Sequence, residues 1–340
     1  MLKYLIGLAA VLFTFDVSAQ CVNAVNAFEI GAGWRRDSLN WDIKNLEGSA
    51  LSADVDDHLH FKDINFYVIN AKYCSCSSEY YFRASADYGT SYNGRAYEKF
   101  ELDTPLYDIG SVVFHTSEKI KRRSEAYDFS GAVGYPFMFC CCRLMISPLI
   151  GFSWHRQHIR SKNSDSKYGS SFVYDTPNDS SFYVKESSSS NPFGFSYSSD
   201  EAYSDPFDSP SPVFIPSELG LSVEKRTSPY RFTWYGFFAG VDIAYALDSY
   251  WTIISQTEFH FLDRCHRKRK SLTGIYFVDD YHKESYAYGF DQKLLITYDM
   301  GSCYYTSLGV EYKYWRTHKS SHDMMWWNNV AINWNLGFAY

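Results

Sequence analysis

The sequence predicts an all-β fold: a transmembrane antiparallel β-barrel of about ten strands with short periplasmic turns and long outer loops. Two observations predict it. Large apolar side chains alternate with small or polar ones along most of the chain, and the connections between these segments alternate in length. The composition agrees, because 19% of the 340 residues are aromatic. The net charge of -7 makes the chain a poor candidate for nucleic-acid binding.

The N-terminus predicts an export signal rather than part of the fold. An apolar core covers residues 5–15, and small residues follow it up to Ala19. This core is too short to cross a bilayer as a helix. We therefore expect a signal peptide over residues 1–19 and a mature barrel over residues 20–340, located in the bacterial outer membrane. Lipid attachment at Cys21 is a weaker alternative, because a glutamine precedes that cysteine.

The last segment of the chain shows the alternation most clearly. Large apolar residues occupy the even positions from Val330 to Tyr340, and small or polar residues lie between them. In an outer-membrane barrel, the large face meets lipid and the small polar face lines the lumen. Several stripes begin and end with aromatic residues, as expected for rings at the two membrane interfaces. Ten segments are expected, at about 26–43, 62–73, 79–91, 125–138, 143–160, 230–247, 250–265, 284–298, 303–316 and 327–340.

The connections between these segments alternate between short and long, which is typical of short periplasmic turns and long outer loops. The short connections are residues 74–78, 139–142, 248–249 and 299–302. The long connections are residues 44–61, 92–124, 161–229, 266–283 and 317–326. An even number of strands places both termini in the periplasm. The alternative fold is a soluble, secreted β-sandwich, whose strands would be shorter and spaced every 8–12 residues.

The lumen face of the expected strands carries charges of both signs. These residues are Arg83, Asp87, Asp128, Asp242, Glu258, His260, Asp291, Lys293, Glu311 and Lys313. A barrel of about ten strands has an interior nearly filled by side chains, whereas open porins have 16–18 strands. We therefore expect an internal network of ion pairs. A narrow porin or channel remains the alternative interpretation.

The longest loop, residues 161–229, differs in composition from the rest of the chain. Residues 161–228 contain 20 serines and six of the ten prolines, so this segment has too little apolar surface to fold alone. It is interpreted as an extracellular surface loop. It also offers a contact surface for host molecules or another protein.

The cysteines predict a second feature, because the expected topology places seven of the eight on the periplasmic side. The disulfide candidates are Cys21, Cys74, Cys76, Cys140, Cys141, Cys142 and Cys303. Only Cys265 is expected near the outer rim. Disulfides persist in the periplasm, and three adjacent cysteines cannot easily pair with one another. Cross-links to cysteine-rich periplasmic or envelope proteins are preferred over a zinc site, and no metal ligands are assigned.

A basic cluster lies near the expected outer rim. It includes Arg267, Lys268, Arg269 and Lys270, which are candidates for contact with the phosphates of lipopolysaccharide. A solvated loop base explains the same residues equally well.

The phrases from Tyr127 to Tyr135, from Ser147 to His155 and from Trp234 to Gly240 resemble a family of chlamydial outer-membrane β-barrel proteins of the Protochlamydia type. The residues from Tyr314 to Thr317 are also similar. The resemblance covers most of the mature chain. It implies an outer-membrane location and no particular activity.

The expected strand number is also similar to that of the omptins, outer-membrane proteases with ten-stranded barrels. Omptins use an Asp pair and an Asp-His pair across an outer groove to activate water. Asp280 and His282 lie in the fourth outer loop, where that resemblance places the Asp-His pair. Asp54 and Asp56 lie in the first outer loop rather than the second, which puts the carboxylate pair in doubt.

The sequence therefore favours an integral outer-membrane barrel with a structural or surface-interaction role, disulfide-linked on its periplasmic side. An omptin-like protease and a narrow porin are the alternatives. The expected partners are membrane lipid, lipopolysaccharide, envelope proteins and host surface molecules, without nucleic acid or cofactor.

Overall fold

The computed structural model describes most of the strands and leaves several connections undescribed. The described residues are 25–43, 54–103, 111–120, 123–140, 143–162, 169–174, 182–184, 229–269, 281–301, 303–318 and 323–340. The expected signal peptide and Cys21 therefore lie outside the described residues, as do Cys141 and Cys142.

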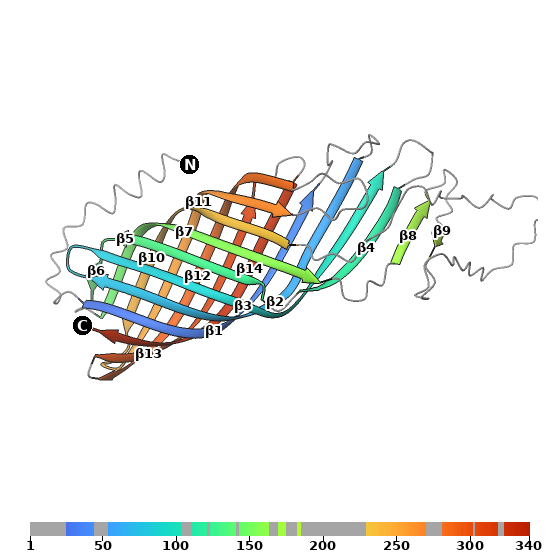
Figure 1. The fold of residues 1–340 in the computed structure, drawn as a ribbon. Helices are drawn as coiled ribbons and strands as arrows, with labels where there is room; N and C mark the ends of the chain where they lie inside the picture. The colour runs from blue at the N-terminus through green and yellow to red at the C-terminus, as the bar shows by residue number, and fades with distance from the viewer. Residues whose placement is uncertain are drawn as a thin grey trace, which may run out of the picture.

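The described chain forms one antiparallel sheet that closes on itself (Figure 1). Its strands are β1 (Val25–Ile43), β2 (Asp54–Cys76), β3 (Tyr81–Asp103), β4 (Ser111–Ile120), β5 (Glu125–Gly134), β6 (Phe137–Phe139), β7 (Leu144–Lys162), β8 (Gly169–Tyr174), β9 (Phe182–Val184), β10 (Pro229–Ala246), β11 (Trp251–Arg269), β12 (Tyr281–Gly301), β13 (Tyr304–Thr317) and β14 (Asp323–Ala339). Ten of them, all except β4, β6, β8 and β9, pair in a ring. The predicted antiparallel barrel of ten strands is confirmed.

The ring closes between the first and last strands. β1 pairs with β14 from Ala27 opposite Ala339 to Ile43 opposite Asp323. Backbone hydrogen bonds between Asn26 and Tyr340 extend this pairing to the chain end, with N–O distances of 3.1 and 2.8 Å. A closed barrel leaves no unpaired edge among these ten strands, which a lipid environment requires.

The outer wall of the barrel is apolar between two rings of aromatic side chains. Exposed aliphatic side chains between the rings include Ile30, Ile69, Ile150, Leu294, Leu308, Val310 and Ile332. The ring nearer the long loops includes Tyr67, Tyr88, Phe152, Phe237, Phe259, Tyr288 and Tyr312. The ring nearer the short turns includes Phe28, Tyr80, Tyr135, Tyr245, Trp251, Tyr298, Tyr304 and Phe338. This arrangement matches a hydrocarbon layer bounded by two interfaces. No helix of the described chain is long and apolar enough to cross a membrane.

The strands continue beyond the outer aromatic ring, where the sequence predicts loops. β2 begins at Asp54 instead of residue 62, and β3 extends to Asp103. β4, β8 and β9 add further pairing at this end, away from the C-terminus (Figure 1). The expected loops 44–61, 92–124 and 161–229 are therefore partly strand.

A bulge bends the long β2–β3 hairpin at the level of the outer ring. The register shifts between Lys62 and Asn65, and Asp63 adopts a φ of 57°. Opposite the bulge, Gly94 has a φ of 153°, and a Cβ there would lie 3.1 Å from the Cα of Ile64. Glycine fits this close approach because it has no Cβ.

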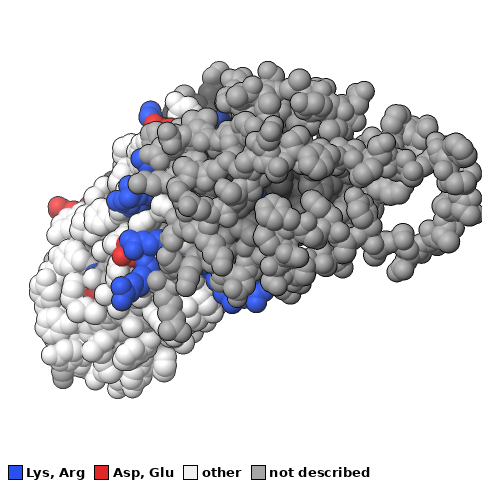
Figure 2. All heavy atoms as spheres, turned by 45° about the vertical axis from the view of Figure 1, so that its right-hand side comes forward, with Lys and Arg blue, Asp and Glu red and all other residues white. Residues whose placement is uncertain are grey.

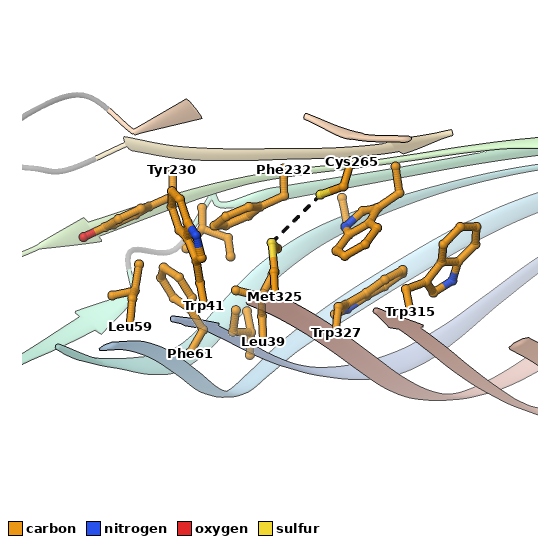
Figure 3. Close-up of a cluster of buried hydrophobic side chains, with 14 of the residues drawn as sticks. Leu39, Trp41, Leu59, Phe61, Tyr230, Phe232, Cys265, Trp315, Met325 and Trp327 are labelled. Carbon is orange, nitrogen blue, oxygen red and sulfur yellow. Dashed lines mark hydrogen bonds between the residues drawn. The ribbon is translucent and has the colours of Figure 1, made fainter. Parts of the chain in front are cut away.

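The interior of the outer part is filled by a buried cluster, which we call the aromatic plug (Figure 3). Its members are Leu39, Trp41, Ile43, Leu59, Phe61, Ile64, Phe66, Val68, Ala96, Ile120, Ala126, Ile159, Tyr230, Phe232, Trp234, Cys265, Ala287, Trp315, Met325 and Trp327. The rings pack edge to face or offset, as in Phe61 on Tyr230, with centroids 4.9 Å apart. Trp315 and Trp327 are fully buried, with ring centroids 6.4 Å apart.

Candidate functional site in the barrel lumen

The lumen between the two aromatic rings is polar, and the strand alternation explains why. Successive side chains point to opposite faces, so a strand with an apolar lipid face presents its other residues to the lumen. The ten charged or titratable residues predicted for the lumen all lie on this inner face. Eight of them are buried, namely Asp128, Asp242, Glu258, His260, Asp291, Lys293, Glu311 and Lys313.

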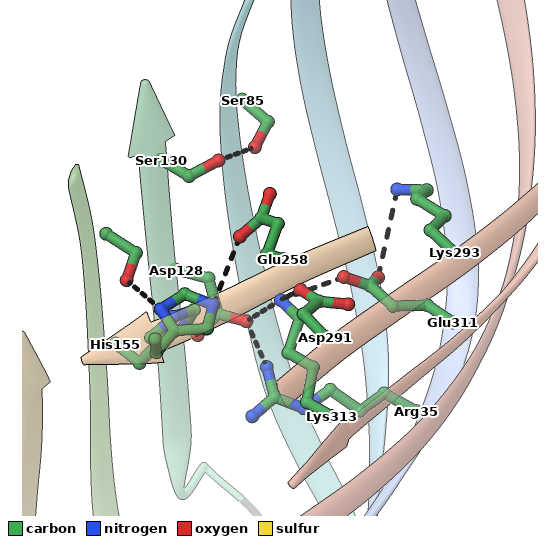
Figure 4. A network of polar contacts seen from close by, with 12 residues as sticks. Arg35, Ser85, Asp128, Ser130, His155, Glu258, Asp291, Lys293, Glu311 and Lys313 are labelled. Carbon is green, nitrogen blue, oxygen red and sulfur yellow. Dashed lines mark hydrogen bonds and ion pairs between the residues drawn. The ribbon is translucent and has the colours of Figure 1, made fainter. Parts of the chain in front are cut away.

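Asp128 on β5 is the centre of the first part of this network (Figure 4). Its Oδ2 accepts from Nη1 of Arg35 at 2.7 Å and from Nζ of Lys313 at 3.3 Å. Its Oδ1 lies 3.2 Å from Nδ1 of His155. Arg35 also donates to Asp37 through Nε at 2.6 Å. Because buried charges require partners, one carboxylate shared by three strands holds this level of the barrel together.

Arg83 on β3 is the centre of the second part. Its Nε lies 3.0 Å from Oδ2 of Asp242, and its Nη2 donates to Oε1 of Glu258 at 2.6 Å. The hydroxyl of Tyr81 donates to the same Asp242 oxygen at 2.8 Å. The other oxygen of Glu258 lies 3.1 Å from Nε2 of His260. These contacts cross the lumen and connect β3 to β10 and β11.

Lysines complete the network on the strands near the C-terminus. Lys313 lies 2.9 Å from Glu311 and 3.6 Å from Asp291. Lys293 lies 3.8 Å from Glu311. Lys72 pairs with Glu29 at 3.8 Å nearer the periplasmic mouth. The predicted internal network of ion pairs is therefore present, and narrow barrels use such networks to fill their interior.

A cavity of about 170 Å³ remains inside this network. It extends from Ala27, Cys76 and Met145 near the short turns to the level of Asp128 and His155. The aromatic plug lies directly beyond that level, because the ring of His155 packs on Trp315 and Trp327 with centroids 4.8 and 5.9 Å apart. None of the aromatic plug residues lines the cavity.

One arrangement in the lumen is similar to a nucleophile with its base. Ser153 Oγ lies 3.2 Å from Nδ1 of His260, whose Nε2 faces Glu258. Ser153 and His260 are both buried, and neither lines the cavity. Because a catalytic serine needs space for a substrate beside it, we assign these residues to the structural network.

The protease hypothesis depended on residues that the structure leaves largely undescribed. Asp280 lies outside the described residues, and the side chains of Asp54 and His282 are also not described. Asp56 lies on β2, opposite Glu101 of β3. His282 lies on β12, opposite Lys268 of β11. Within the described chain, no group of three or more His, Cys, Asp or Glu side chains is arranged to hold a metal ion.

The structure separates the cysteines by environment. Cys140 and Cys303 are exposed in short turns, both with positive φ, whereas Cys74 and Cys76 lie at the periplasmic end of β2. The Sγ of Cys76 lies 3.8 Å from Sδ of Met145. Cys265 lies near the outer end of β11, as expected, and its side chain is fully buried in the aromatic plug. The bulge between His260 and Asp263 changes which residues of β11 face inward and turns Cys265 into the barrel.

The basic cluster is also divided by strand alternation. Arg267 points inward and pairs with Asp323 in a fully buried position, so it cannot contact lipopolysaccharide. Lys268 points outward and is partly exposed. The side chain of Arg269, and all of Lys270, lie outside the described residues.

The sequence analysis missed several lumen residues. Glu29, Arg35, Lys72, Tyr81 and His155 all line the lumen, and the same period of two places them there. The alternation that begins at Phe28 would have indicated the inward direction of Arg35.

Comparisons with known proteins agree with this architecture. The family model described as Protochlamydia outer membrane protein (Pom) matches residues 29–338. No curated protein matches the chain. The crystal structure of the outer membrane protease OmpT from Escherichia coli has a TM-score of 0.59 at 8% identity, covering 96% of this chain and 99% of that chain. At that identity the likeness shows the fold alone.

Two other solved structures align over most of their length with low scores. The attachment invasion locus protein Ail of Yersinia pestis has a TM-score of 0.29 at 7% identity, covering 92% of this chain and 99% of that chain. The translocator domain of the autotransporter NalP from Neisseria meningitidis has a TM-score of 0.28 at 7% identity, covering 99% and 94%.

Proposed function

Because the chain belongs to the Protochlamydia outer membrane protein family, we propose that it is a closed outer-membrane barrel with a structural or surface-contact role. The barrel is located in the bacterial outer membrane, with its short turns in the periplasm and its long loops outside. The proposal adds that the lumen does not conduct and that the periplasmic cysteines link the barrel to other envelope proteins.

The observation that carries the proposal is the aromatic plug. A conducting pore needs a continuous polar path, whereas this lumen ends beneath Trp315 and Trp327. Trp41 packs edge to face on Phe232 further out, with centroids 5.7 Å apart. Tightly packed apolar side chains leave no room for hydrated ions. This supports a barrel that serves as a scaffold rather than as a channel.

The disulfide part of the proposal rests on the exposed cysteines. Cys140 and Cys303 lie in separate short turns at the periplasmic end, accessible to a second protein. Disulfides persist in this compartment. The surface-contact part rests on residues 161–229, the long connection between β7 and β10, whose serine and proline content is typical of an interaction loop.

Planar-bilayer conductance tests the closed lumen. The full chain is refolded in detergent, checked by its heat-modifiable gel mobility, and inserted in a bilayer. We expect no steady ionic conductance, and a Trp315→Ala/Trp327→Ala variant that still folds should conduct intermittently. A steady open channel in the unmodified chain would contradict the proposal and favour the narrow porin.

Non-reducing gels of cell envelopes test the disulfide linkage. The chain should migrate in high-mass bands that collapse on reduction, and Cys140→Ser/Cys303→Ser should deplete these bands. Cys265→Ser is the matched control, because a buried thiol inside the plug cannot reach a partner. Unchanged bands in the double variant would overturn the assignment of these two cysteines.

A further inference from the structure

Outward-facing basic side chains gather on β7, β10 and β11 just beyond the outer aromatic ring. We call this surface the basic ledge, and its members are Arg156, Arg160, Arg231, Arg264 and Lys268. Figure 2 shows Lys and Arg side chains gathered at one end of an otherwise largely uncharged barrel wall. The ledge differs from the predicted cluster, since it excludes the buried Arg267.

The strand register brings the ledge residues together. Arg231 lies opposite Lys268 on one side and His158 on the other. Arg156 and Arg160 flank His158 at alternate positions of β7, on the same face. Burial lowers the pKa of His158, the charges of Arg160 and Arg231 lower it further, Glu125 opposes them, and Arg156 adds a still smaller lowering effect. Three strands thus concentrate positive charge on one face.

The ledge carries more cationic than anionic groups. Glu284 lies 2.7 Å from Nη1 of Arg264, and Glu125 lies 3.8 Å from Nδ1 of His158. Within the described part of the chain, Arg156, Arg160 and Arg231 have no ion-pair partner. Among the described residues, Arg156, Arg160 and Arg231 therefore keep guanidinium groups that are free to bind an anion.

The position of the ledge identifies its partner. Outward-facing aromatic side chains lie on the membrane side of the ledge. They are Trp154 on β7, and Tyr235 and Phe237 on β10. On β11, Phe259 and Phe261 lie on the membrane side of the ledge. Charged groups directly beyond an interfacial aromatic ring lie at the depth of lipid head groups. Guanidinium groups bind phosphate oxygens in bidentate geometry. Arginines at this depth are therefore suited to bind head-group phosphates.

We propose that the basic ledge binds the phosphates of an outer-leaflet glycolipid of the lipopolysaccharide class. Arg156, Arg160 and Arg231 contact phosphate, and the neighbouring aromatic side chains contact the acyl chains. This fixes one lipid against β7, β10 and β11 and orients the barrel in the outer leaflet.

The test measures binding of lipid A to the refolded full chain in micelles of a zwitterionic detergent. We expect saturable binding of bisphosphorylated lipid A that weakens as sodium chloride is raised. Arg156→Ala/Arg231→Ala should weaken it about 30-fold, from roughly 1 kcal/mol for each basic residue near an anionic surface. Arg231→Gln alone should weaken it about fivefold, which keeps the test valid if the double variant fails to fold.

Two controls separate the possible sources of binding. Arg143→Ala removes one exposed positive charge at the opposite, periplasmic end and should leave the affinity unchanged. Inorganic phosphate at the same phosphate concentration should not compete. Full competition by inorganic phosphate, equal binding of dephosphorylated lipid A, or unchanged affinity in the Arg231→Gln variant would each overturn the proposal.

Discussion

The two parts of the barrel interior have opposite chemistry although the same strands build both. Between the aromatic rings, β1 turns Phe28 and Ile30 to the outside and Arg35 to the inside. Beyond the outer ring, the same strand exposes Arg36 and buries Leu39 and Trp41. The alternation continues without interruption, while the apolar residues change from the outer face to the inner face.

The exchange of apolar residues between the two faces shows where the environment of the barrel wall changes from lipid to water. Next to lipid, the apolar face must point outward and the lumen takes the polar residues. Next to water, the apolar face must point inward, as in a soluble barrel. β14 behaves in the same way, with Trp334 exposed and Asn333 buried near the turns but Trp327 buried further out. The exchange of faces therefore marks the outer boundary of the membrane-spanning part.

The largest effect is expected in the membrane-level network. Asp128→Ala removes the carboxylate shared by Arg35, Lys313 and His155 and leaves two cations buried with fewer partners. Breaking a buried ion pair on one side costs about 3–5 kcal/mol. Urea unfolding of the refolded chain in micelles measures this loss. A loss below about 1 kcal/mol would show that water, not Asp128, satisfies these cations.

A smaller effect is expected in the aromatic plug. Gly289 lies beneath Trp315, and a Cβ at this position would approach the indole ring to 2.8 Å. Gly289→Val should therefore displace the ring and reduce the free energy of unfolding by about 1–3 kcal/mol. Gly131→Val is the matched control, because nothing lies within 4 Å of a Cβ there. Equal losses in both variants would contradict the tight packing of the plug.

The smallest effect is expected on the outer surface. Arg36 pairs with Asp63, and their side chains are 50% and 40% exposed. Such pairs contribute about 0–1 kcal/mol because water screens them. Arg36→Ala should therefore change the urea midpoint only slightly. A loss comparable to that of Asp128→Ala would remove the contrast between buried and exposed charges.

The barrel and its lumen were predictable because they depend on local alternation. A period of two identifies the lipid face, and the opposite positions then include Asp128, Glu311 and Lys313. The partners were not predictable, since His155 meets Asp128 only through the pairing of β5 with β7. The strand number alone does not give that register.

The outer part of the barrel was missed for a different reason. The sequence analysis took the large apolar face of the segments to meet lipid, and residues 54–61 were expected to belong to the loop 44–61. Leu59 and Phe61 instead keep the alternation with their apolar side chains inward. The inward direction of Arg267 was also missed, because it depends on the bulge between His260 and Asp263.

Sided labelling of a single cysteine tests the closed outer part most directly. Ser85 lines the cavity, 2.8 Å from Ser130, so Ser85→Cys places a thiol inside it. The native cysteines are replaced by serine, and the barrel is reconstituted with known orientation. We predict that a membrane-impermeant methanethiosulfonate reagent labels this thiol from the periplasmic side only. Labelling at equal rates from both sides would contradict a lumen sealed by the aromatic plug.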